Sequence, residues 1–154
     1  MLIRIAIFAS LLLALPAWAA DLSGKPKIID GDTLDVAGQR IRLFGVDAPE
    51  SKQTCALNGT PWDCGKEATA VLTRLIDGKL ITCQERDRDR YKRVVAVCYV
   101  DGLDINEAIV RQGWALSYRR YSRVYVPAED EARKAMVGMW RGKFVEPWDW
   151  RRHR

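Results

Sequence analysis

Two apolar segments on either side of a charged turn restrict the fold of this chain more than any other feature. The segments "KLITCQ" and "RVVAVCYV" flank "ERDRDRYK", and they contain Cys83 and Cys98. Short apolar runs separated by a polar turn predict an antiparallel hairpin over residues 79–100. The two cysteines are roughly symmetric about the turn. Directly opposed residues in such a pair have Cα atoms about 4.5–5.5 Å apart, a separation that a disulfide can bridge.

The four cysteines therefore read as a disulfide framework. Four cysteines allow three pairings, and spacing alone does not choose between them. The hairpin favours Cys83 with Cys98, which leaves Cys55 and Cys64 to close a short loop; a pairing of Cys83 with either of those two would mean that the predicted register is wrong. A zinc site has little support, because no C-x-x-C spacing occurs and the only histidine is His153.

The first twenty residues have the pattern of a cleavable secretory signal peptide. "MLIRIAIFASLLLALPAWAA" carries Arg4, an apolar stretch, Pro16, and small residues at Ala17 and Ala19, so we expect cleavage after Ala19 or Ala20. The alternative, an uncleaved anchor, would need a longer apolar run. We expect residues 21–154 to form a single domain that is secreted or periplasmic, monomeric and free of the membrane after cleavage.

Net charge permits a polyanionic partner without requiring one. The chain has 25 basic and 20 acidic residues, and the leader removes only Arg4, so residues 21–154 carry a net charge of +4. The distribution of charge matters more than this sum. The tail "VEPWDWRRHR" is basic and aromatic, and two readings stay open: contact with nucleic acid, or docking of Trp148 and Trp150 onto the domain.

The remaining pattern predicts an α+β fold. Strands are expected at "KPKIID", "TLDVAG" and "QRIRLFGVD", with a turn at Gly38, and a short strand over 115–118. Helices are expected over 65–77, over 104–113 with the capping box "DINE", and from Pro127 with a buried face of Ala128, Ala132, Ala135, Met136 and Met139. Five twisted strands with three helices suit a Greek-key barrel of the oligonucleotide-binding (OB) type.

Two carboxylates are predicted to converge. In the hairpin formed by residues 33–46, Asp32 lies near the far end of the second strand, and that end carries Asp47. Two uncompensated carboxylates repel each other, so a hard cation between them or a proton on one of them is expected. Taken singly, each aspartate is equally well explained as a turn residue.

Three further charged residues indicate which reaction this pair of carboxylates could support. Arg42 lies five residues before Asp47 and can project into the same concavity, and Arg93 lies at the base of the cysteine hairpin. An arginine fork suits a phosphate, and Glu50 is available to activate water. Carboxylates for a divalent ion, a carboxylate for water and two arginines for phosphate are the groups that phosphodiester hydrolysis needs.

In combination, four motifs resemble one known family. "DGDT", "RLFGVDAPE", "DRYKR" and "VRQGWA" occur in the order and with the approximate separations of the staphylococcal nuclease (thermonuclease) family, over residues 27–140. The resemblance implies an OB barrel with three helices. It also implies a calcium-dependent endonuclease that cuts DNA and RNA, prefers single strands and leaves 3′-phosphate ends.

The resemblance also assigns roles to residues. It makes Asp32 and Asp47 calcium ligands together with the backbone carbonyl of Ala48, where the best-known member has threonine. Arg42 and Arg93 match the phosphate-binding arginines, and Glu50 matches the glutamate that activates or positions water. The substrate-binding residues would be Arg90, where the family uses lysine, Tyr91, and Tyr118 or Tyr121. The alternative function is a non-catalytic OB module that binds nucleic acid; such a module should lack an acid or arginine of the set, and none is missing. A third possibility, an exported domain that binds a protein, predicts no calcium linkage.

Overall fold

The computed structural model describes residues 21–153. The signal peptide predicted over residues 1–20 lies outside the described residues. Within them, no helix is both long enough and apolar enough to cross a membrane.

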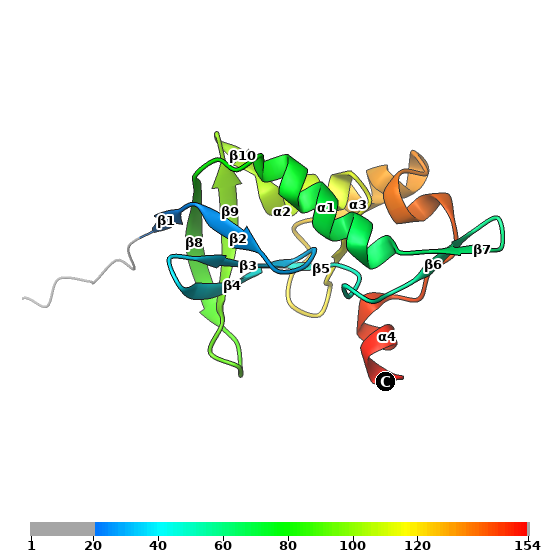
Figure 1. The fold of residues 1–154 in the computed structure, drawn as a ribbon, viewed down its shortest axis with the longest axis horizontal. Coiled ribbons are helices and arrows are strands. Elements are labelled where there is room, and N and C mark those ends of the chain that lie inside the picture. Colours follow the sequence, from blue (N-terminus) through cyan, green and yellow to red (C-terminus); the bar gives the residue numbers. More distant parts are fainter. Residues whose placement is uncertain (1–20, 154) are drawn as a thin grey trace, which may run out of the picture.

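A curled sheet forms one end of the molecule (Figure 1). Its strands run in the order β1-β8-β9-β4-β3-β2, with β10 pairing to β9. Their bounds are β1 (Leu22–Gly24), β2 (Pro26–Ile28), β3 (Thr33–Val36), β4 (Gln39–Leu43), β8 (Ile81–Arg88), β9 (Val94–Val100) and β10 (Leu103–Asp104).

The sheet curls because β1 and β2 belong to one segment that bends at Lys25. β1 pairs with β8 and β2 pairs with β3, so this segment joins both edges of the sheet. Taken as one bent strand, it completes the five-stranded ring that the sequence predicts, and short β10 is an addition. β4 and β9 pair in parallel. The fold is α+β of the OB type, as predicted.

The first predicted hairpin forms around a tight two-residue turn. Val36 pairs with Gln39, and Ala37 and Gly38 both have positive φ, at 52° and 81°. Positive φ at both central residues is the geometry of the turn that matches the twist of paired strands. The turn places Thr33 opposite Arg42, which fixes Asp32 beside the end of β4.

The cysteine hairpin also forms as predicted. Cys83 pairs with Cys98 in the register of β8 and β9, and these two residues form a disulfide. The second disulfide joins Cys55 to Cys64. One detail differs from the prediction: "ERDR" extends β8 up to Arg88 instead of forming the tip, and the register shifts between Glu85 and Asp87. A bulge accommodates the extra residue and lengthens the strand.

Helices cover one side of the barrel and extend away from it (Figure 1). They are α1 (Cys64–Ile76), α2 (Ile105–Arg111), α3 (Val126–Lys134), the 3-10 helix η1 (Gly138–Arg141) and α4 (Pro147–Arg152). The predicted capping box is present in part, because the Asp104 side chain accepts a hydrogen bond from the Glu107 amide at 2.9 Å. α1 is followed directly by Asp77, whose φ of 51° stops the helix.

The third helix is shorter than the sequence pattern predicts. α3 stops at Lys134, and Met136 has a φ of 53°, which breaks the helix before η1 begins. Ala135 and Met136 are exposed, whereas Ala128, Ala132 and Met139 are buried. The apolar spacing continued past the point where the backbone turns, so the periodicity alone overestimated the helix.

Two small pairings and two cores complete the fold. β5 (Val46–Asp47) pairs with β11 (Leu116–Ser117), and β6 (Cys55–Leu57) pairs with β7 (Thr60–Trp62). The larger core lies inside the barrel and beneath α1, α2 and α3. The smaller core surrounds the Cys55–Cys64 disulfide and is covered by aromatic side chains: Trp62, Trp114, Trp140, Phe144 and Trp148.

Candidate active site

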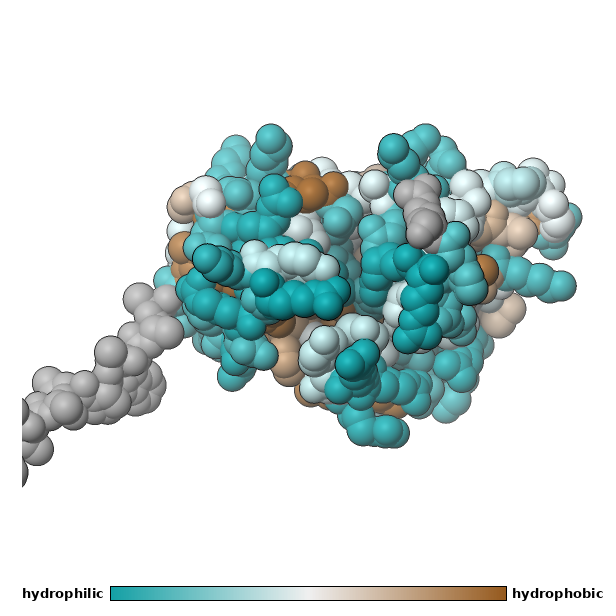
Figure 2. All heavy atoms as spheres, turned by 90° about the horizontal axis from the view of Figure 1, so that it is seen from below, coloured by the Kyte–Doolittle hydropathy of each residue, from teal (hydrophilic) through white to brown (hydrophobic). Residues whose placement is uncertain are grey.

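A cleft of about 860 Å³ lies where the barrel faces α4. Its lining comes from the ends of β3 and β4, the β8–β9 turn, the segment around Tyr118, and α4. In Figure 1 the β8–β9 turn and α4 project toward the same side, and Figure 2 looks onto that side, where hydrophilic side chains dominate. A polar cleft of this size suits an extended charged ligand better than an apolar small molecule.

Arg42 joins the two aspartates that were predicted to converge. Its Nη1 lies 3.1 Å from Asp32 Oδ1, and its Nη2 lies 2.6 Å from Asp47 Oδ1. Asp32 directly precedes β3, Arg42 lies on β4, and Asp47 lies on short β5. The pairing of β3 with β4 and the short connection to β5 bring these side chains together. The structure thus brings Asp32, Arg42 and Asp47 together: Asp32 and Arg42 line the cleft, and Asp47 is fully buried behind them.

Burial makes the charges of these carboxylates unfavourable unless opposite charges lie close to them. The Asp47 side chain is fully buried, and that of Asp32 is 5% exposed. Burial raises the pKa of Asp47, and the neighbouring Asp32 carboxylate raises it further, while Arg151 and Arg42 act in the opposite direction. Burial acts against the charged form of Arg42, but the two aspartates outweigh it and hold the pKa of this guanidinium above its ordinary value. The carboxylates therefore depend on positive charge close by.

The turn before β3 adds an acid that sequence reasoning did not assign. Asp30 Oδ1 accepts a hydrogen bond from the Asp32 amide at 3.0 Å. Burial, together with the Asp32 carboxylate, raises the pKa of Asp30 to about 6. Ala48 is buried, and its amide donates to Asp32 Oδ2 at 2.8 Å. Asp30 was recognisable only as the first residue of "DGDT", where it reads equally well as a turn residue.

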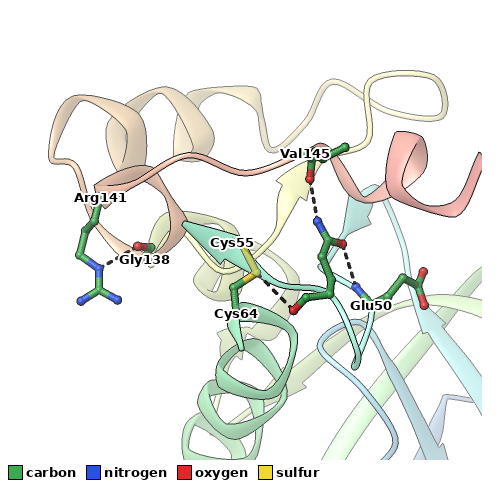
Figure 3. The surroundings of a disulfide bond; sticks show 7 residues. Glu50, Cys55, Cys64, Gly138, Arg141 and Val145 are labelled. Atoms are coloured by element: carbon green, nitrogen blue, oxygen red, sulfur yellow. Dashed lines mark hydrogen bonds between the residues drawn. A yellow bond between two sulfur atoms is a disulfide. The ribbon is translucent and has the colours of Figure 1, made fainter. Parts of the chain in front are cut away.

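The Gln53 side chain fixes the segment that carries Glu50 by linking it to Val145; Figure 3 shows Glu50 and Val145 at the two ends of this link. The Glu50 amide donates to Gln53 Oε1 at 3.2 Å, and Gln53 Nε2 donates to the Val145 carbonyl at 2.7 Å. Gln53 is fully buried. The N-terminus of α1 packs directly on the same segment: a Cβ at Gly65 would lie 1.8 Å from the Glu50 carbonyl oxygen. Sequence reasoning missed both supporting residues, because neither belongs to a charged motif.

Arg93 is held by the turn that precedes β9. Its Nε lies 2.6 Å from Asp89 Oδ2, and its amide donates to Asp89 Oδ1 at 3.0 Å. Burial favours the neutral acid, but the Arg93 contacts prevail and lower the pKa of Asp89 below its ordinary value. Tyr91 is 65% exposed, and the guanidiniums of Arg90 and Arg93 lie over its ring at 4.8 and 5.6 Å from the centroid. All four residues line the cleft.

Tyr118 lies on the opposite wall, where α4 covers part of it. Its ring stacks on Trp148 with centroids 5.6 Å apart and planes 14° apart, and it meets Tyr121 edge-on. Tyr121 is 67% exposed. Of the two open readings of the tail, docking of Trp148 is therefore observed. One face of Tyr118 is taken by Trp148, so Tyr121 is the freer ring for stacking on a base.

The largest omission of the sequence interpretation is Arg151 on α4. Its Nη2 lies 2.8 Å from Asp47 Oδ2, and its Nη1 lies 2.9 Å from Glu50 Oε1. The available signal was a basic tail that begins with Pro147, a favourable first residue of a helix. No local pattern relates that tail to Asp47, which is 104 residues away in sequence.

The donor chemistry of the cleft fits a hard divalent cation. Asp32 and Asp47 present carboxylate oxygens that calcium favours, and the positive charge that their burial demands is partly supplied by Arg151. In residues 21–153 no group of three or more acidic, histidine or cysteine side chains is arranged to hold a metal. A cation at this point would therefore depend on the two aspartates together with backbone and water oxygens.

An OB barrel suits the binding of an oligonucleotide, and arginines beside carboxylates suit the stabilisation of charge on a reacting phosphate. Residues 40–142 match the family described as "Staphylococcal nuclease homologue". The chain therefore belongs to the staphylococcal nuclease family, and its class of activity is that of a nuclease. Asp32 precedes the matched region and Arg151 follows it.

Curated relatives align over most of the chain. An "Uncharacterized endonuclease" of Escherichia coli is 36% identical over 88% of this chain and 89% of its own length. A "Micrococcal nuclease" of Shigella flexneri is 32% identical over 92% of this chain and 87% of its own. A "Succinoglycan biosynthesis protein ExoI" of Rhizobium meliloti is 36% identical over 90% of this chain and 75% of its own.

Proposed function

We propose that this protein is an exported, calcium-dependent endonuclease that hydrolyses DNA and RNA, prefers single strands and leaves 3′-phosphate ends. The observation that carries the proposal is the cluster in which Arg42 joins buried Asp32 and Asp47, at the edge of a cleft that Glu50 and Arg93 also line. Export with removal of residues 1–20, followed by action as a monomer in the periplasm or the medium, is part of the proposal. Two disulfides are compatible with an oxidising compartment.

Each side chain has a role in the proposed reaction. Glu50 orients a water molecule and accepts its proton as the water oxygen attacks phosphorus. The bond from phosphorus to the 5′ oxygen breaks, and that oxygen takes up a proton from solvent water as it leaves, while Glu50 returns its proton to the solvent. Arg42 and Arg93 donate hydrogen bonds to the phosphate oxygens as charge develops on them. Calcium, held by Asp32, Asp47 and the Ala48 carbonyl, would supply Lewis-acid stabilisation of that charge.

Substrate contacts follow from the walls of the cleft. Arg90 and Tyr91 stand on the β8–β9 turn, where a guanidinium and an exposed ring suit a terminal phosphate and its sugar. Tyr118 and Tyr121 offer rings on the opposite wall. Aromatic rings beside basic groups favour unstacked bases, which is the physical basis for preferring single strands or frayed ends.

The test is digestion of plasmid and single-stranded DNA by residues 21–154, with calcium, with magnesium, and with chelator. Glu50→Gln should lower kcat by about 10² or more, and Arg93→Ala should do likewise. Glu67→Gln and Arg74→Ala make the same chemical changes on the exposed face of α1 and should cut at the wild-type rate. Tight, salt-sensitive DNA binding without cutting under any metal would favour the non-catalytic module instead.

A further inference from the structure

Arg151 makes two of the three side-chain hydrogen bonds that the Asp47 carboxylate accepts. Asp47 Oδ1 accepts from Arg42 Nη2 at 2.6 Å and from Arg151 Nη1 at 3.0 Å, and Oδ2 accepts from Arg151 Nη2 at 2.8 Å. Asp47 is fully buried, so no second face of the carboxylate is open to solvent. A cation that binds Asp47 directly would meet the Arg151 guanidinium at both carboxylate oxygens, where two positive charges repel each other.

Arg151 also holds the second acid of the cleft. Its Nη1 donates to Glu50 Oε1 at 2.9 Å as well as to Asp47. A single guanidinium therefore neutralises a proposed metal ligand and the proposed general base together. Its side chain is 35% exposed, so it lies at the mouth of the cleft and not in its interior.

The helix that carries Arg151 is also attached through apolar side chains: Pro147 is buried, and Trp148 packs against the smaller core. The chain before α4 is anchored, because Lys143 and Ala56 exchange backbone hydrogen bonds at 2.8 Å and the Val145 carbonyl accepts from Gln53. α4 itself has six residues and begins directly after Glu146, which is extended. Its described contacts with the cleft are the Arg151 ion pairs and the stacking of Trp148 on Tyr118. The partly exposed Arg151 side chain can leave Asp47 by rotation about its own bonds, while these apolar contacts keep the helix in place.

We propose that Arg151 is an internal counter-ion that competes with the divalent cation for Asp47, so that calcium binding and the Arg151 ion pairs exclude each other. This inference rests on the calcium site of the proposed function. When Arg151 is docked, it supplies the positive charge that the buried carboxylates need. When calcium binds, Arg151 leaves Asp47 and Glu50, and Glu50 becomes free to act on water.

The competition can be measured as a change in the apparent affinity for calcium. If the docked state accounts for about nine-tenths of the molecules, the apparent calcium affinity is reduced about tenfold relative to a protein without the competitor. Removal of the Arg151 guanidinium should restore that affinity. Arg152 is the matched control, since it lies on the same helix, carries the same charge, and pairs with Asp149 of its own helix at 3.0 Å.

The experiment is calcium titration by calorimetry on residues 21–154, without nucleic acid, for the wild type, Arg151→Ala, Arg152→Ala and Asp47→Asn. Hydrogen exchange of the amides of residues 147–153, with calcium and with chelator, is the second readout. We expect Arg151→Ala to bind calcium about tenfold more tightly than the wild type and Arg152→Ala to match the wild type. Calcium should speed exchange in α4 of the wild type, because the helix then loses the Arg151 ion pairs.

Two results would overturn the inference in different ways. Equal calcium affinity in the wild type and Arg151→Ala, with exchange in α4 unchanged by calcium, would show that the two ligands do not compete and would leave the calcium site intact. Absence of calcium binding in every variant, Arg151→Ala included, would remove the calcium site and the competition together. Retained binding in Asp47→Asn would place the cation elsewhere and would also refute the competition.

Discussion

Arg42 donates to Asp47 across 2.6 Å in a site where the carboxylate has no exposure to solvent. The same guanidinium contacts Asp32 at 3.1 Å. One arginine thus compensates two buried acids, which ties the stability of the barrel to the chemistry of the cleft.

Replacement of Arg42 by alanine should destabilise the protein by about 3 kcal/mol in chelator, because two buried carboxylates lose a partner. Urea unfolding measures this free energy. Arg40→Ala is the control on the same strand, where the side chain is exposed. An equal loss in Arg40→Ala would mean that the ion pairs contribute nothing specific.

Replacement of Gln53 by alanine should lower kcat about tenfold or more with little change in KM. The reason is that the Glu50 amide and the Val145 carbonyl lose the side chain that links them, and small displacements of a catalytic group are costly. Steady-state kinetics at a temperature where the variant is folded measures the effect.

Asn106→Ala controls for simple destabilisation in that experiment. Asn106 is also a fully buried amide, but it bonds to Cys98, Phe44 and Ala96 instead of to the Glu50 segment. Similar kcat values for the two variants would argue that Gln53 has no positioning role.

The two disulfides should differ in their effect on activity more than in their effect on stability. Replacement of both cysteines of a pair by serine should cost about 3 kcal/mol for Cys83–Cys98 and about 2.6 kcal/mol for Cys55–Cys64, from closed-loop lengths of 15 and 9 residues. Cys64 begins the turn of α1 that packs on Glu50, so loss of this pair should also lower kcat. Thermal unfolding and kinetics on both variants check this, and an equal kcat in the two would contradict it.

Asp89→Asn should destabilise the protein at pH 7, and this loss should shrink as the pH falls below 3.8. The pKa of Asp89 is depressed in the folded protein, so its contribution is present above the ordinary value of 3.8 and is lost as pH falls through the lower folded value. The pair is partly exposed, so the loss should be at most about 1 kcal/mol. Urea unfolding at pH 7 and at successively lower pH values below 3.8 measures it, beside Asp87→Asn on the exposed end of β8. A difference that stays constant as the pH falls below 3.8 would contradict the assignment.

Short-range patterns predicted much of this protein. The hairpin around the charged turn, the turn at Gly38, the Asp104 cap and the pairing of Cys83 with Cys98 all follow from residues close in sequence, whose geometry is limited by strand alternation and turn chemistry. The convergence of Asp32 and Asp47 also followed, because a hairpin register relates them through one strand. The predicted end of the third helix was wrong, because the apolar spacing continues across a backbone turn at Met136.

The sequence by itself determined the barrel, its disulfides and the acids and arginines that line one end of β3, β4 and β9. Only the tertiary structure decided what faces those acids. Arg151 reaches Asp47 across 104 residues, and Gln53 reaches Val145 across 92, through packing of the chain after η1 against the cleft. Such contacts leave no periodic signal, because their free energy depends on where two distant segments meet and not on the spacing of residues within either one.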